Sequence, residues 1–142
     1  MIIYTLNFLL AVLIGSMTFF MAVVSPSIFA TLRTNTSSKL LRRIFPRMFL
    51  FGFIIAILSL ILCYISDNIL NSILLIIVAI SFIINRNYLT PKINGLRDKE
   101  LEGDKKASSS FKYMHLLSVL LFVLNFVILI GIVINNYFNF NL

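Results

Sequence analysis

Residues 45–88 decide the fold of this chain, and they read FPRMFLFGFIIAILSLILCYISDNILNSILLIIVAISFIINRNY. The segment holds two apolar runs of about 20 residues each, the length that an α-helix needs to cross the hydrocarbon core of a bilayer. A short polar stretch around Asp67 and Asn68 separates the two runs. Because so short a connection joins antiparallel neighbours, the sequence predicts a pair of membrane-spanning helices over residues 45–65 and 69–88.

Two further apolar runs flank this pair, at residues 2–24 and 111–134. All twelve Lys and Arg residues lie in two stretches, residues 33–47 and 86–112. Because basic loops of membrane proteins stay in the cytoplasm, both stretches are expected on the same side of the membrane. The sequence therefore predicts an all-α, integral membrane four-helix bundle in a bacterial inner (plasma) membrane, with both basic loops cytoplasmic and both termini outside.

The composition predicts a single transmembrane domain over residues 1–142. Hydrophobic residues make up 60% of the chain and the mean hydropathy is +1.02, whereas soluble domains are about 45–50% apolar. The net charge of +7 then indicates contact with anionic lipid headgroups and not with nucleic acid. Cys63 is the single cysteine, so no intrachain disulfide can form. The first apolar run is longer than the hydrophobic part of a signal peptide and lacks a basic start, which predicts a retained helix.

Three prolines are expected to shape the helix ends, because proline lacks the backbone N–H donor. Pro26 should kink or end the first helix, Pro46 should mark the start of the second, and Pro91 should end the third. Residues 98–106 hold four acids and three bases, which predicts a solvated linker without a site. The serines at residues 108–110 are expected to cap the fourth helix.

The fourth predicted helix carries a polar stripe. Positions three and four residues apart share one helical face, and on this face lie Phe111, His115, Ser118, Phe122 and Asn125. Because polar side chains are unfavourable against hydrocarbon, the stripe is expected to point into the bundle. It forms either a functional site or a set of hydrogen bonds that hold the helices together. In the second interpretation, the partners would be Ser16, Thr18, Ser59 or Ser81.

Polar residues near the cytoplasmic helix ends form a second cluster. Arg42 and Arg86 belong to it, together with most of the residues named below as ligand-binding. A ring of donors at one membrane depth suits an anionic headgroup or phosphate. The predicted ligand-binding residues are Arg43, Arg47, Asn85, Tyr88, Lys92, His115 and Ser118. The alternative is that basic residues only enforce topology. That interpretation is favoured for Arg33, Lys39, Lys105 and Lys106.

Three motifs resemble those of a known family. They are Ser38-Lys39-Leu40 with Phe45-Pro46-Arg47-x-Phe49, then Asn85-x-x-Tyr88-Leu89-x-Pro91-Lys92, then Phe111-x-x-x-His115-x-x-Ser118. On these motifs the chain resembles the transmembrane protein 205-like family of bacterial-type four-helix membrane proteins, over nearly its whole length. The family commonly has an Asn where this chain has Phe122, and the nearest Asn here is Asn125. The resemblance implies the fold and the membrane location, and no activity.

Three functions are compatible with these residues. The first is a non-enzymatic protein whose cytoplasmic-side pocket binds a membrane lipid or another anionic amphiphile. The second is a haem- or quinone-linked membrane oxidoreductase, in keeping with a distant likeness to haem and copper-handling four-helix families. His115 allows single-His ligation within one chain, or ligation by two copies of His115 in a homodimer. The third is a structural subunit of a larger membrane complex or a homo-oligomer. No catalytic residue, metal site or firm cofactor is predicted.

Overall fold

The computed structural model describes residues 1–140, and all regular structure in that part of the chain is helical. In chain order the elements are α1 (Ile2–Phe19), η1 (Phe20–Val24), α2 (Ser25–Thr31), α3 (Thr34–Ile65), α4 (Ile69–Ile84), η2 (Asn85–Leu89), α5 (Thr90–Leu101) and α6 (Lys105–Phe140). The segments η1 and η2 are single π-helical turns. Four continuous stretches are long and apolar enough to cross a membrane: Ile2–Thr31, Thr36–Ile65, Ile69–Leu101 and Lys105–Phe138. This confirms the predicted all-α class and indicates a multi-pass integral membrane protein.

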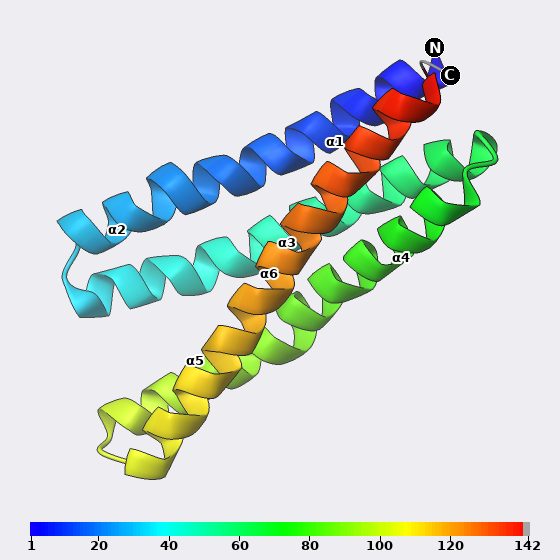
Figure 1. Ribbon diagram of the computed structural model, residues 1–142. Helices are drawn as coiled ribbons and strands as arrows, with labels where there is room; N and C mark the ends of the chain where they lie inside the picture. Colours follow the sequence, from blue (N-terminus) through cyan, green and yellow to red (C-terminus); the bar gives the residue numbers. More distant parts are fainter. Residues whose placement is uncertain (141–142) are drawn as a thin grey trace.

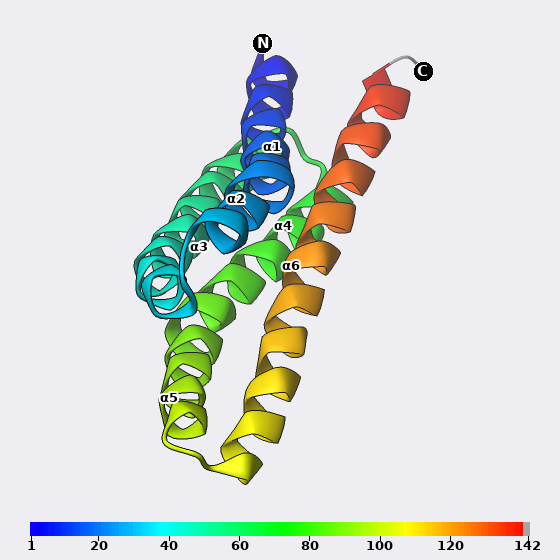
Figure 2. The same ribbon diagram turned by 90° about the vertical axis from the view of Figure 1, so that its left-hand side faces the viewer.

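The four stretches form an elongated bundle (Figure 1). The start of α1, the turn between α3 and α4, and the last turns of α6 lie at one end, which we call the terminal end. The α2–α3 and α5–α6 turns lie at the other end, which we call the basic end because they connect the segments that hold every Lys and Arg. Towards the basic end the α2–α3 pair and the α5–α6 pair diverge (Figure 2).

Pro91 was predicted to end its helix and Pro26 to kink or end its own, but neither proline ends the helical path, because a π-helical turn precedes each of them. In both turns the residue before the proline donates its backbone N–H to the carbonyl five residues back, from Ser25 to Phe20 and from Thr90 to Asn85. The wider turn gives room for the proline ring, which would otherwise clash with a carbonyl one turn earlier. The helical path therefore continues through α2 and α5.

Pro46 lies inside α3 and not at its start, where it was predicted. The helix already begins at Thr34, eleven residues before the predicted start at residue 45. Arg33 has an extended backbone conformation (φ −61°, ψ 149°), and Leu32 before it is also extended, so these two residues alone connect α2 to α3. The connection is short, and it holds the end of α2 close to the first turns of α3.

α6 is longer at both ends than the predicted helix over residues 111–134. Its first turn is capped by Asp104, whose Oδ1 accepts the backbone N–H groups of Lys106 at 2.8 Å and Ala107 at 3.1 Å. The serines at residues 108–110, predicted as the cap, lie within the helix. Gly103 makes the preceding turn possible with φ at 97°, a conformation that other residues rarely adopt.

α3 and α4 form an antiparallel hairpin with a close contact between Gly52 and Phe82. A Cβ atom added at Gly52 would lie 2.7 Å from Cζ of the Phe82 ring, which is nearer than van der Waals contact allows. Phe82 is 1% exposed, so the ring has little room to move away. The turn of this hairpin is as compact as predicted: Asp67 has φ at 54°, and the Asn68 side chain accepts the backbone N–H of Asn71 at 3.1 Å.

Four asparagines join three helices at the terminal end. Asn136 on α6 accepts a hydrogen bond from Nδ2 of Asn71 on α4 at 2.8 Å and donates one to Oδ1 of Asn7 on α1 at 2.9 Å. Asn135 donates to Oδ1 of Asn71 at 3.0 Å. Asn71 lies in the first turn of α4 and Asn135 near the end of α6. The asparagine network therefore fixes α1 to α6 at the terminal end.

Candidate functional site

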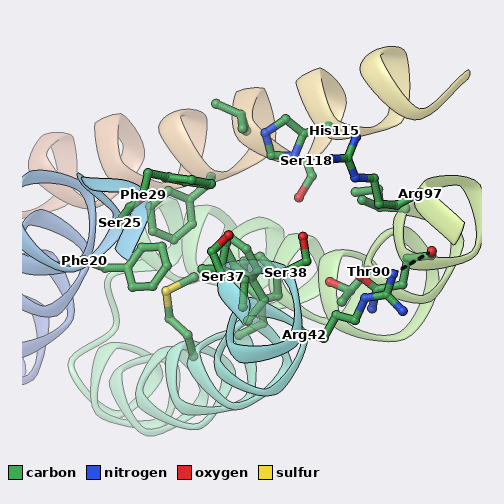
Figure 3. A pocket seen from close by; sticks show the side chains of 18 of the residues that line it. Phe20, Ser25, Phe29, Ser37, Ser38, Arg42, Thr90, Arg97, His115 and Ser118 are labelled. Carbon is green, nitrogen blue, oxygen red and sulfur yellow. Dashed lines mark hydrogen bonds between the residues drawn. The ribbon is translucent and has the colours of Figure 1, made fainter. Parts of the chain in front are cut away.

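A cavity of about 540 Å³ lies at the basic end, where the helix pairs diverge. Its walls come from η1, α2, α3, α5 and α6, and Figure 3 shows side chains from these elements facing one another across it. The volume falls within the range of about 300–1,000 Å³ that is usual for sites that enclose a small ligand. One part of the lining is aromatic and the other is polar.

The aromatic part of the cavity is built from phenylalanines that pack on one another. The Phe45 ring lies 5.4 Å from Phe20 in an edge-on arrangement and 5.9 Å from Phe49 in a stacked one, measured between ring centroids. Phe49 in turn meets the edge of Phe122 at 6.3 Å. Such offset and edge-on pairs are the favoured geometries for aromatic rings. Phe49 and Phe122 also belong to the buried core, so the aromatic part of the cavity is continuous with the core of the bundle.

Arg42 reaches the polar part of the cavity from α3 and is held there by α5. Its Nη1 donates to Oδ2 of Asp98 at 3.0 Å, its Nη2 donates to Oδ1 of the same carboxylate, and Nη2 also approaches the carbonyl oxygen of Asn94 at 3.4 Å. Asp98 was predicted to lie in a solvated linker without packing, but it belongs to α5 and forms this two-pronged ion pair. The pair joins α3 to α5 at the basic end.

Arg97 also enters the cavity from α5, where it directly precedes Asp98. Its guanidinium pairs with Glu100 and lies 5.3 Å from the centroid of the Phe111 ring, where cation–π attraction favours it. Phe111 stacks on His115 with 5.9 Å between the ring centroids. Arg97 uses one N–H group for Glu100, so most of the five donors of its guanidinium are left for another partner.

Asn85 lies directly behind the cavity wall. Its side-chain oxygen accepts the hydroxyl proton of Ser118 at 2.5 Å, and its backbone oxygen accepts that of Thr90 at 2.7 Å. Both hydroxyl residues line the cavity, whereas Asn85 is fully buried and its Nδ2 has no hydrogen-bond partner. Ser118 therefore finds its helix partner in Asn85, itself a predicted site residue, and not in the four residues proposed from the sequence.

The structure brings together three of the seven predicted ligand-binding residues: His115 and Ser118 line the cavity, and Asn85 supports Ser118. The other four are exposed and lie outside the lining, namely Arg43, Arg47, Tyr88 and Lys92. Lys92 instead donates to the Tyr88 hydroxyl at 3.1 Å, over the Tyr88 ring. The prediction rested on the common membrane depth of the seven residues. It did not take into account the direction in which each side chain points from its helix.

Several lining residues were not among the predicted ligand-binding residues: Ser25, Ser37, Ser38, Arg42, Thr90, Asn94 and Arg97. A signal for part of this set is present on α5. Thr90, Asn94 and Arg97 follow helical spacing and share one face. Pro91 hides this pattern in the sequence, because a proline at that position predicts the end of the helix. In residues 1–140 no group of three His, Cys, Asp or Glu side chains is placed to hold a metal ion.

Replacing Ser118 with alanine is expected to lower the free energy of unfolding by about 1–3 kcal/mol, because the buried Asn85 amide loses the one side-chain partner that the described residues give it. The effect can be measured by unfolding the protein with increasing mole fractions of a denaturing detergent in mixed micelles. Ser110→Ala is the matched control, since Ser110 is an exposed serine of the same helix. Equal stability of the two variants would contradict a structural bond between Ser118 and Asn85.

The greater part of the chain matches a known protein family. A family described as a domain of unknown function (DUF4149) matches residues 8–102. No curated protein and no solved structure matches the chain. The matched segment includes the walls of the cavity from η1, α2, α3 and α5, and α6 follows after it.

Proposed function

The chain belongs to this family with a domain of unknown function, and from that premise we propose that it is a non-enzymatic, multi-pass inner-membrane protein that binds an anionic lipid or amphiphile in the cavity at the basic end. One observation carries the proposal: a single cavity has aromatic side chains on one side and arginines with hydroxyl groups on the other. That division matches a molecule with an apolar chain and a polar head. The resemblance to the transmembrane protein 205-like family belongs to the same proposal.

The polar part of the cavity suits a negatively charged head. Arg97 keeps unused N–H donors, and Ser38 adds a hydroxyl group to the same lining, whereas the Ser118 hydroxyl is bound to Asn85. The arginines are paired with Asp98 and Glu100, but the basic segments hold twelve Lys and Arg against four acids, so an excess of positive charge surrounds the cavity. Charge-assisted hydrogen bonds to a phosphate or carboxylate would follow from this arrangement.

The proposal includes the orientation of the protein in the membrane. Basic loops face the cytoplasm in inner-membrane proteins, so the cavity would open near the cytoplasmic leaflet and both termini would lie outside. Anionic lipids give that surface a negative potential, which attracts the basic end. The ligand's head would then sit at the depth of Arg97 and His115, and its chain would extend towards Phe122.

The chain contains no tryptophan, so one introduced tryptophan can report on the cavity. Phe45→Trp places the reporter in the aromatic lining, and lipids with brominated acyl chains quench its fluorescence on contact. In nanodiscs we expect anionic brominated lipid to quench this reporter at about tenfold lower content than zwitterionic brominated lipid, a preference that one or two charge-assisted bonds would produce. Phe51→Trp, an exposed position outside the lining, should be quenched equally by both lipids.

Two arginine variants separate the cavity from the general charge of the basic end. In the Phe45→Trp background, Arg97→Gln should reduce the preference for anionic lipid by about five- to tenfold. Arg43→Gln removes the same charge from an exposed position outside the cavity and should leave the preference in place. No quenching of the Phe45→Trp reporter, or the same loss in both arginine variants, would refute the proposed function.

A further inference from the structure

The cavity is incomplete on the side between α2 and α6. Both helices contribute to its lining, yet in the described part of the chain no Cα atom of α2 lies within 8 Å of one in α6. Figure 3 shows Ser25 and Phe29 of α2 on one side of the cavity and His115 and Ser118 of α6 on the other. The asparagine network joins α1 to α6 at the terminal end, and nothing comparable joins α2 to α6 among residues 1–140.

Three residues at this gap belong both to the cavity lining and to the outer surface. Phe29 on α2 is 64% exposed, and Val119 and Val123 on α6 are each 42% exposed. A closed pocket would bury these side chains, because they are apolar and lie at its edge. They line the cavity and are exposed at the same time, which is the arrangement expected where a cavity opens sideways between two helices.

The gap lies at a depth where those surroundings are hydrocarbon. Lys112 is the last charged residue of α6, and Val123 follows it by eleven residues, about 16 Å along a helix axis. The distance from His115 to Val123 is about 12 Å on the same scale. A molecule lying along this path has its polar end at Arg97 and His115 and its apolar end beside Phe122 and Val123, which is the orientation of a lipid in a leaflet.

We propose that the gap between α2 and α6 is a lateral portal, through which one acyl chain of an anionic membrane lipid passes from the bilayer into the cavity while the headgroup stays at the basic end. The portal is formed by Phe29 on one side and by Val119 and Val123 on the other. This inference rests on the proposed function, and it adds the source of the ligand, the surrounding leaflet, and its route. A volume of about 540 Å³ suits one chain with its polar end, so a second chain of the same lipid remains in the bilayer.

The test measures how fast lipid exchanges through the portal. The Phe45→Trp protein is placed in nanodiscs of unlabelled lipid and mixed with vesicles that contain anionic brominated lipid, and the loss of fluorescence is followed in time. To close the portal, Phe29→Cys and Val119→Cys are combined with Cys63→Ala, which removes the single native cysteine. A bifunctional thiol reagent then links the two introduced cysteines. The control is the same protein treated with a monofunctional reagent of similar size.

Closing the portal is expected to slow the exchange about tenfold relative to the control, as for other sites whose access is gated. A second variant does not depend on cross-linking: Phe29→Ala, in the same reporter background, widens the gap and should make the exchange several times faster. Equal rates in the cross-linked and control proteins would overturn the portal, and so would an unchanged rate in Phe29→Ala.

Two further outcomes separate the portal from the proposed function. If the uncross-linked reporter is never quenched by brominated lipid, no acyl chain occupies the cavity, and both the function and the portal fail. If quenching at equilibrium is normal and a water-soluble anionic detergent displaces the lipid equally fast with the portal open or cross-linked, ligands reach the cavity from the aqueous end. The portal then fails while the proposed function stands.

Discussion

Replacing Asn136 with alanine is expected to lower the free energy of unfolding by about 1–3 kcal/mol. The change removes two hydrogen bonds, and it leaves Nδ2 of the buried Asn71 and Oδ1 of the half-buried Asn7 without these partners. Individual hydrogen bonds between membrane helices contribute about 0.6 kcal/mol on average and up to about 1.7 kcal/mol, so two bonds account for this range. The measurement is unfolding by a denaturing detergent, monitored by circular dichroism.

Asn87→Ala is the matched control for the asparagine network. Asn87 is exposed and accepts one long hydrogen bond, at 3.3 Å, from its neighbour Arg86. Its loss should change the stability by less than about 0.5 kcal/mol, as is usual for surface positions. If Asn136→Ala is no less stable than Asn87→Ala, the network does not hold the terminal end together.

Gly52→Ala is expected to lower the free energy of unfolding by a similar amount, about 1–3 kcal/mol. The new methyl group would lie 2.7 Å from the Phe82 ring, and this ring is enclosed by the hairpin partner and by Phe49, 6.4 Å away between ring centroids. Helices must therefore move apart or the ring must leave its rotamer, and overpacking of this kind costs energy in well-packed cores. Unfolding of the variant and the parent protein under identical detergent conditions gives the difference.

Two comparisons isolate the contact from the effect of alanine on helix formation. Gly15→Ala makes the same chemical change at a site with no atom within 4 Å of the new Cβ, so its stability should be unchanged or up to about 1 kcal/mol higher. Combining Gly52→Ala with Phe82→Leu removes the ring and should cost less than the sum of the two single changes. Additive costs in this double variant would show that the Gly52 contact with Phe82 is not the cause.

The number and order of the membrane-length helices could be predicted because they depend on the length of apolar runs alone. The helix ends could not be predicted, because of two prolines. Pro26 and Pro91 were assessed against regular α-helical geometry, in which they interrupt the chain. The π-helical turns before them arise from Ser25 and Thr90 bonding five residues back, and no periodicity in the sequence reveals such a turn.

Only part of the candidate site could be predicted from the sequence. His115 and Ser118 were predicted from a polar stripe that was expected to face inwards. Ser118 is half-buried and meets a partner from another helix, whereas His115 lines the cavity but is exposed. Arg42 and Arg43 are neighbours at one depth, but consecutive residues on a helix point about 100° apart, and only Arg42 faces the cavity. Which arginine turns inwards depends on Asp98, and that carboxylate approaches only because α5 is a helix.

The two π-helical turns make the lining of the cavity sensitive to chain length. Each turn holds more residues than an α-helical turn, so deleting a single residue from η1 or η2 would convert it to regular helix. Everything after the deletion would rotate by about 100° relative to what precedes it. A deletion in η2 would leave hydropathy and span length almost unchanged, yet it would swing Arg97 away from the cavity and bring a different side of α5 to face Arg42.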